Sequence, residues 1–300
     1  MRNRIALAAA LAMALFALAA GAAAASEVFQ QSVAEGELGR VRASAAALTL
    51  TDEGETFTVI CEVQMNLSLA RSIAGVSGTS AGSAREATVR NCRGGEVRLL
   101  EATWSIAYAS FSGTLPTFSA LRFRVSGVGL LLRAFFGASQ CLYGGTFEVT
   151  TVGGATVTEL RADESRTVPL VTRLGGIVCP ASGRLRGSLR LAPAVRQVGG
   201  DYVLGAEPDD NTVAAGDFIE IFLRNRSTGN LEVTVASVVL SDATHFTLDR
   251  RALALRSSRI PPGDEVAIRV TAEAGAGAGE RTNVDITYDN NKSVRARVRV

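Results

Sequence analysis

Four cysteines and a single histidine carry the most reactive side chains in this 300-residue sequence. A serine or cysteine nucleophile assisted by histidine would have to use His245, because the chain holds no other histidine. His245 stands beside Phe246 in a segment that we interpret as the edge of a strand. One histidine also cannot supply the several imidazole ligands that are typical of catalytic zinc. We therefore expect neither a nucleophile–histidine enzyme nor a zinc enzyme.

Carboxylates are the only acid–base groups that this reasoning leaves open. Four of them gather in one stretch: Glu207, Asp209, Asp210 and Asp217. Calcium prefers such oxygen-rich loops, but the spacing of an EF-hand loop is missing. We predict a solvated acidic loop with no metal and no cofactor. A carboxylate-dependent hydrolase, with two carboxylates held across a cleft, is kept as a weak alternative.

The cysteines are better suited to disulfides than to metal binding. Cys61, Cys92, Cys141 and Cys179 form no Cys-x-x-Cys pair, and His245 lies far from them in the sequence. An even number of cysteines in an exported chain is typical of a disulfide framework. Four cysteines allow three connectivities, of which we favour Cys61–Cys92 with Cys141–Cys179. Each bond would stabilise the fold by roughly 3–4 kcal/mol.

Export is predicted from residues 1–25, which have the layout of a secretory signal peptide. A basic start at Arg2 and Arg4 precedes a run of apolar residues, and small residues follow before Ser26. The run is long enough to be an uncleaved membrane anchor, which is the alternative. The chain has 31 basic and 29 acidic residues, so loss of Arg2 and Arg4 leaves 29 of each. A neutral chain argues against nucleic acid as a partner, and after cleavage we expect no integral membrane span.

Short alternating runs separated by glycine predict an all-β domain over residues 26–194. In residues 57–63, for example, Phe57, Val59, Cys61 and Val63 fall on one face of a strand. This spacing of strands and turns is typical of a β-sandwich or barrel. Residues 65–74 could instead form one or two helical turns. A boundary is expected near residues 192–200.

The most apolar segment of this domain, residues 127–137, is a candidate ligand patch. With the only tryptophan it gives the set Trp104, Leu130, Leu132, Phe135 and Phe136. Buried core packing is the ordinary role of such residues. The alternative is a cavity in the N-terminal domain that holds a lipid or a glycan.

The sequence of the second half, residues 198–300, indicates about seven strands. This number of strands in such a length is typical of an Ig-like β-sandwich. Its segments follow in the order 213–216 (VAAG), 221–225 (IFLRN), 229–235 (GNLEVTV), 245–248 (HFTL) and 260–263 (IPPG). This order resembles the ASPM/SPD-2/Hydin-type Ig-like domain of bacterial choice-of-anchor D proteins. The resemblance implies an accessory or spacer module without catalytic residues. The N-terminal half resembles uncharacterised exported actinobacterial proteins.

These observations predict an all-β bacterial protein that is secreted or held at the cell surface. We expect a non-enzymatic binding or structural spacer protein of the cell envelope or medium, with a partner from the envelope or the extracellular space. Binding of a lipid or glycan by the N-terminal domain is the first alternative function.

Overall fold

The structure is a computed structural model, and it describes residues 27–34, 37–52, 54, 58–101, 103–134, 139–174 and 179–300. Residues 1–25, predicted to be a signal peptide, lie outside the described residues. Strands dominate, so the predicted all-β fold class is confirmed. In the part of the chain that the structure describes, no helix is long and apolar enough to cross a membrane.

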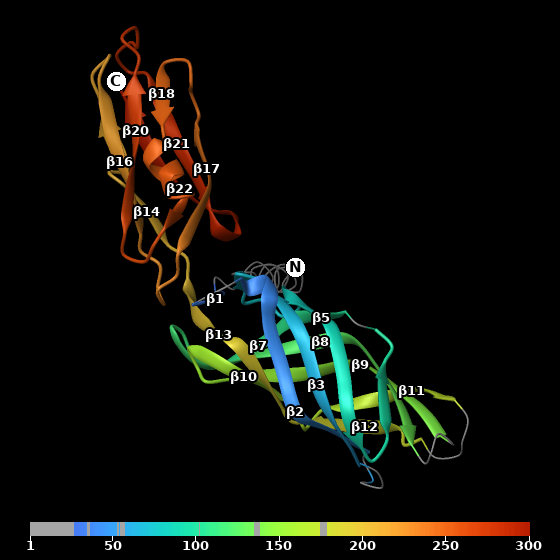
Figure 1. Cartoon of the computed structure of the whole chain (residues 1–300). Coiled ribbons are helices and arrows are strands. Elements are labelled where there is room, and N and C mark those ends of the chain that lie inside the picture. The colour runs from blue at the N-terminus through green and yellow to red at the C-terminus, as the bar shows by residue number, and fades with distance from the viewer. Residues whose placement is uncertain are drawn as a thin grey trace, which may run out of the picture.

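Within the described ranges, the N-terminal part closes into a barrel of eight antiparallel strands, and Figure 1 shows the closed ring. The strands are, in order around the ring, β2 (Val41–Asp52), β3 (Thr58–Leu69), β5 (Ser80–Arg93), β7 (Trp104–Thr114), β8 (Thr117–Ala134), β9 (Ser139–Val152), β10 (Thr156–Ala162) and β13 (Ser188–Asp201). The ring closes where β13 pairs with β2, with Leu191 opposite Ala43. The prediction of a sandwich or a barrel thus resolves to a barrel.

Smaller elements extend the ends of this barrel. They are β1 (Glu27–Val33), η1 (Leu38–Arg40), β4 (Ser72–Ala74), β6 (Glu96–Leu99), β11 (Thr167–Leu174) and β12 (Ser182–Arg186). The β11–β12 hairpin bridges β9 and β2 at one end, and β1 with β4 continues the sheet beyond β13. Residues 65–69 lie in β3 and residues 72–74 in β4, with only Ala70 and Arg71 between them, so the helical alternative for this segment is wrong. Pairing with β2 and β5 outweighs the weak helix propensity of this segment.

Side chains at every second strand position point inward and fill the barrel. In β2, Val41, Ala43 and Ala45 are buried, whereas Arg42 and Ser44 are exposed. The same period of two places Val59, Cys61, Val63, Met65 and Leu67 of β3 inside. Phe57, expected on the same face, lies outside the described residues.

The C-terminal part is a two-sheet β-sandwich. One sheet has the order β14 (Leu204–Glu207), β16 (Phe218–Asn225), β20 (Glu265–Ala272) and β18 (Phe246–Asp249). The other has the order β15 (Asp210–Thr212), β22 (Lys292–Arg299), β21 (Arg281–Tyr288), β17 (Val233–Leu240) and β19 (Arg259–Ile260). The short helix α2 (Arg251–Leu255) buries Leu253, and η3 (Asp289–Asn291) makes the turn between β21 and β22.

The two domains meet along β1 and the end of β13 (Figure 1). Successive residues of β1 point in opposite directions, so Val28 belongs to the sandwich core and Phe29 to the barrel core. β13 continues to Asp201, and Tyr202 is already buried in the sandwich core. Residues 192–200, expected to form a boundary, lie within β13, which pairs with β1 as far as Asp201, and Val198 already packs against the sandwich core.

Candidate functional site

The predicted apolar patch forms part of the barrel interior. Trp104, Leu130 and Leu132 are buried in the barrel core, and the indole N–H of Trp104 donates to the carbonyl oxygen of Glu101 at 3.1 Å. The ring of Trp104 meets that of Phe147 edge to face, with centroids 6.5 Å apart. Phe135 and Phe136 lie outside the described residues. The described members of the patch thus pack the barrel and present no exposed aromatic platform.

Two small voids remain between these side chains, with volumes of about 40 and 30 Å³. Both border Met65, Trp104 and Phe147. Pockets for drug-sized ligands measure roughly 300–1,000 Å³, so this interior admits a water molecule or two but no lipid chain. The side-chain oxygens of Gln31 and Gln197, which line the larger void, have no hydrogen-bond partner among the described residues. A void of this size beside two amide oxygens suits buried water.

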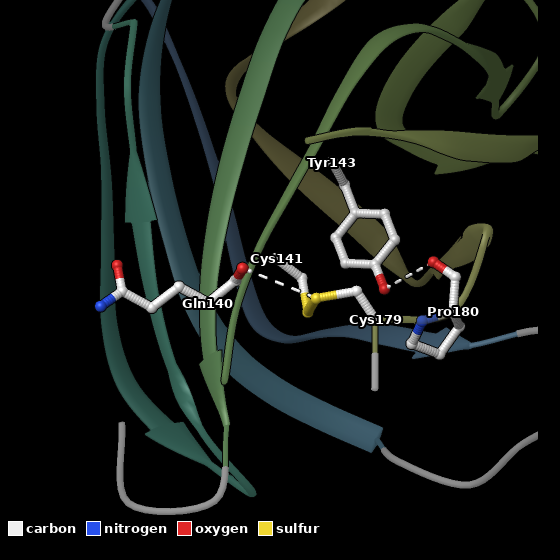
Figure 2. The surroundings of a disulfide bond; sticks show 5 residues. All are labelled: Gln140, Cys141, Tyr143, Cys179 and Pro180. Atoms are coloured by element: carbon white, nitrogen blue, oxygen red, sulfur yellow. Dashed lines mark hydrogen bonds between the residues drawn. A yellow bond between two sulfur atoms is a disulfide. The ribbon is translucent and has the colours of Figure 1, made fainter. Parts of the chain in front are cut away.

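The disulfide pairs are Cys61–Cys92 and Cys141–Cys179, the pairing that the sequence favoured. Figure 2 shows Cys179 reaching β9, where its Sγ lies 3.6 Å from the carbonyl oxygen of Gln140. Beside the bond the hydroxyl of Tyr143 donates to the carbonyl oxygen of Pro180 at 3.2 Å. Burial raises the pKa of Tyr143 to about 12. Cys61–Cys92 thus links β3 to β5, and Cys141–Cys179 links β9 to the segment before β12. Such bonds are typical of an oxidising compartment.

His245 is held between two carboxylates in the sandwich. Its Nδ1 lies 3.3 Å from Asp242 Oδ2 and 3.4 Å from Glu280 Oε2. The backbone N–H of Thr244 and the ring of His245 both hold the pKa of Asp242 below its usual value. These contacts join the loop before β18 to the loop before β21. No hydroxyl or thiol contacts the ring among the hydrogen bonds of the described residues.

The predicted acidic cluster is divided among separate contacts. Glu207 pairs with Arg226 and Arg224, and Asp210 lies 3.7 Å from Arg299. Asp217 accepts a hydrogen bond from the N–H of Phe218, and Asp209 is exposed at the start of β15. Over the described ranges no three histidine, cysteine or acidic side chains converge as a metal site.

One motif that the sequence reading passed over is Gly78-Thr-Ser-Ala-Gly82, a Gly-x-Ser-x-Gly pattern. A nucleophile elbow requires a strand, a sharp turn and a helix. Here Ser80 opens β5, which is a strand, and the only histidine lies in the sandwich. The pattern therefore lacks the context of an elbow.

A hollow with polar walls lies outside the barrel, over β2, β3 and β5. We call it the arginine groove: a hollow of about 570 Å³ lined by Gly39, Arg40, Arg42, Asn66, Ser68, Arg85, Glu86 and Ala192. In the paired strands Arg42 stands opposite Asn66, and Asn66 stands opposite Arg85. Sequence reasoning missed this site. Its only local signal was the outward position of Arg42 in an alternating strand.

A second hollow of about 310 Å³ continues the same face by one step of the ladder. Ser44 pairs with Gln64, and Gln64 pairs with Thr88, and all three line this hollow together with Glu62 and Arg90. The two hollows thus share the outer surface of the same three strands, which lie side by side in Figure 1.

Comparison with known proteins identifies no family. No family model and no curated sequence matches the chain. Among solved structures, the chain is similar to domains 4 and 5 of the S-layer protein SbsC (TM-score 0.28, 10% identity, covering 86% of this chain and 98% of that one). It is also similar to the VesB protease of Vibrio cholerae (TM-score 0.26, 9% identity, covering 90% and 98%). At these TM-scores neither likeness carries an argument about function.

Proposed function

We propose that this chain is an exported, non-enzymatic binding protein of the cell envelope or medium. In this proposal the barrel carries the binding surface, and the sandwich is an Ig-like spacer that holds the barrel in a fixed orientation. The observation that carries the proposal is the junction between the domains, which is built from directed hydrogen bonds as well as apolar contact.

Gln30 is the central residue of the junction. Its side-chain N–H donates to the carbonyl oxygen of Glu232 at 2.6 Å, and its side-chain oxygen accepts from the N–H of Glu232 at 2.9 Å. The same amide nitrogen lies 2.8 Å from the hydroxyl of Tyr202, which also bonds to Ser72. An amide side chain with both ends engaged fixes position and rotation together. A barrel residue therefore completes the hydrogen bonding of the sandwich backbone.

Close backbone approach adds to this restraint. A Cβ on Gly229 would lie 1.8 Å from the carbonyl oxygen of Gly199, and one on Gly200 would lie 2.3 Å from that of Thr228. Lys292, the only lysine, pairs with Asp201 and donates to the carbonyl oxygen of Tyr202 at 2.9 Å. Relative motion is the default between linked domains, and we expect these contacts to restrain it here.

The alternatives have less support. A lipid carrier needs a cavity several times larger than the voids of about 40 and 30 Å³ in the barrel. A glycan would instead have to bind the outer surface of the barrel. A carboxylate-dependent hydrolase needs two free carboxylates across a cleft, whereas Glu207 and Asp210 lie beside arginines. A binding and spacing role uses the features that are present.

Residual dipolar couplings of the mature chain test the proposed spacer. We expect one alignment tensor to fit the amides of both domains, because the junction makes them a single body. In Gln30→Ala, which removes both bonds to Glu232, we expect the two tensors to diverge while each domain stays folded. Gln64→Ala, an exposed glutamine on the outer face of the barrel, is the matched control.

Two different tensors in the unaltered chain would contradict the spacer role. Export is tested separately by fractionating a bacterium that expresses the full sequence. We expect the chain in the medium or the envelope fraction with all four cysteines oxidised. Reduced protein retained in the cytoplasm would contradict the assigned compartment.

A further inference from the structure

The arginine groove and the hollow beside it carry more arginines than acids: Arg40, Arg42, Arg85 and Arg90 against Glu62 and Glu86. Among the described residues, Arg40, Arg42, Arg85 and Arg90 have no carboxylate oxygen within 4.0 Å of a guanidinium nitrogen. The two acids on this face bond to amides instead, with Glu86 accepting from Asn66 at 2.6 Å and Glu62 accepting from Asn91 at 2.9 Å. Glu62 stands opposite Arg90 in the ladder, and both acids keep their charge, so four guanidinium groups against two carboxylates leave this face with an excess of two positive charges.

The pairing of the strands places these arginines along one strip of the outer surface. Arg42 on β2 and Arg85 on β5 flank Asn66 of β3 in the paired ladder, and Arg40 lies just before β2 in η1. Neighbouring strands lie about 4.8 Å apart, so arginines two strands apart can hold a chain that runs between them. A guanidinium binds a carboxylate or a phosphate through two parallel hydrogen bonds. The groove thus has the charge and the width for an anionic chain.

The remaining lining residues indicate the chemistry between the anions. Asn66, Ser68, Ser44, Gln64 and Thr88 offer amides and hydroxyls along the floor. These groups exchange hydrogen bonds with the hydroxyls of a polyol. None of the residues that line the two hollows is aromatic. Proteins that bind single-stranded nucleic acid rely on aromatic side chains to stack the bases, so nucleic acid fits this face poorly.

We propose that the arginine groove binds an anionic carbohydrate polymer, a chain of sugar or polyol units that carry carboxylate or phosphate groups. Arg42 and Arg85 hold successive anions, Arg40 and Arg90 extend the strip at its two ends, and the polar floor bonds to hydroxyls. This inference rests on the proposed function, because it assigns the ligand class of the barrel that the sandwich would hold in place.

Binding of labelled polymers to the mature, oxidised chain tests the inference. The probes are polygalacturonate, which carries carboxylates, and poly(glycerol phosphate), which carries phosphodiesters; neutral dextran and single-stranded DNA are the comparison polymers. We expect fluorescence anisotropy to show binding of at least one anionic polyol, weakening as salt rises, with no binding of dextran. The relative affinities of the two anionic polyols decide between carboxylate and phosphate.

The decisive variant is Arg42→Gln with Arg85→Gln, which removes two charges from exposed positions. We expect its affinity for the bound polymer to fall at least about tenfold, because two charge-assisted contacts are lost, and its salt dependence to become shallower. The matched control is Arg281→Gln with Arg297→Gln, two exposed sandwich arginines outside the ion pairs of the described residues. This control loses the same net charge at a different place. Because the location of the charge matters as well as its sum, its affinity should stay within about twofold of that of the unaltered chain. Fluorescence of Trp104 verifies that the barrel is folded in both.

Three results would overturn the inference: no binding of either anionic polyol, equal losses in the groove variant and the control, or tighter binding of DNA than of both polyols. Each of these leaves the alignment tensor of the two domains unchanged. The arginine groove can therefore fail while the proposed spacer role stands. Separate tensors with intact polymer binding would be the opposite outcome.

Discussion

The outer face of β2, β3 and β5 and the outer faces of the sandwich use arginine in opposite ways. In the sandwich, arginines lie beside acids on neighbouring strands, as Arg224 does with Glu265 at 2.6 Å and Arg269 with Glu220 at 3.0 Å. On the barrel face, Arg42 and Arg85 stand opposite neutral Asn66, and Arg90, although opposite Glu62, forms no ion pair among the described residues. Exposed ion pairs contribute only about 0–1 kcal/mol each, so neither arrangement decides the fold. The difference lies in the electric field each surface presents to a partner.

The two domains also differ in the interactions that reinforce their interiors. The barrel is cross-linked by two disulfides, whereas the sandwich has no cysteine and carries its polar restraint in buried hydrogen bonds. Asn225 is the clearest case, since its side chain is 2% exposed and fully engaged. Each domain has an apolar core, to which the barrel adds covalent bonds and the sandwich adds satisfied polar groups.

Reduction of the disulfides should have the largest effect and should act on the barrel alone. The bonds close loops of 31 and 38 residues, each worth about 4 kcal/mol in the chain-entropy model. Urea unfolding followed by the fluorescence of Trp104, the only tryptophan, reports on the barrel. We expect its midpoint to fall with a reducing agent. Amide exchange in β20 and β21 of the sandwich should stay unchanged, and equal loss in both domains would show that they unfold as one unit.

Asn225→Ala should destabilise the sandwich by about 3 kcal/mol. The side-chain amide donates to the carbonyl oxygens of Leu231 and Ile260, both at 2.8 Å, and its oxygen accepts from the N–H of Ser227. A buried polar group left without a partner costs roughly 1–3 kcal/mol. Asn225→Asp keeps the acceptor but loses the donor and should be nearly as harmful. If amide exchange in β16 and β20 is unaffected, the hydrogen bonds of Asn225 do not hold the sandwich.

Alkaline pH should weaken the barrel through its buried tyrosines. Burial raises the pKa of Tyr108 and of Tyr143 to about 12, above the usual value near 10. Because the folded-state pKa is raised, the stabilisation is fully present below pH 10 and is lost as pH rises toward 12. At pH 11 each tyrosine should have cost the barrel on the order of 1 kcal/mol relative to pH 9. Tyr143→Phe, followed by Trp104 fluorescence, should lose less between these pH values; an equal loss would remove Tyr143 as the cause.

The strands and the covalent links of this molecule could be predicted from the sequence because they depend on local signals. Alternation in residues 57–63 identified β3 and the inward side of Cys61. The spacing of cysteines left three pairings, and the two sequential loops are those present. The barrel closure had no such signal, because Leu191 meets Ala43 across some 150 residues of chain.

The candidate site was beyond reach for the same reason. Arg42, Asn66 and Arg85 are polar residues on three different strands, and only the register of β2, β3 and β5 brings them together. A shift of one residue in any strand would turn its side chain inward. The junction was equally hidden, because Val28 and Phe29 look alike in sequence and pack into different cores.

Replacement of Asp289 by asparagine should change the stability of the sandwich least, and it should stabilise the sandwich where the preceding changes destabilise a domain. The carboxylate accepts the backbone N–H of Thr234, but burial is the stronger influence and raises the pKa of Asp289. Since the folded-state pKa is raised, the group favours folding when protonated, and that contribution is lost as pH rises through the folded-state pKa. Asp289→Asn keeps an acceptor oxygen without the buried charge, so the sandwich should be at least as stable as the unaltered chain at pH 7. This advantage should disappear near pH 3.

Asp285→Asn, which removes the partner of exposed Arg295, is the control and should give no such gain. Amide exchange of β17 and β21 measures both variants, and a loss of stability at pH 7 in Asp289→Asn would mean that the hydrogen bond to Thr234 outweighs burial of the charge.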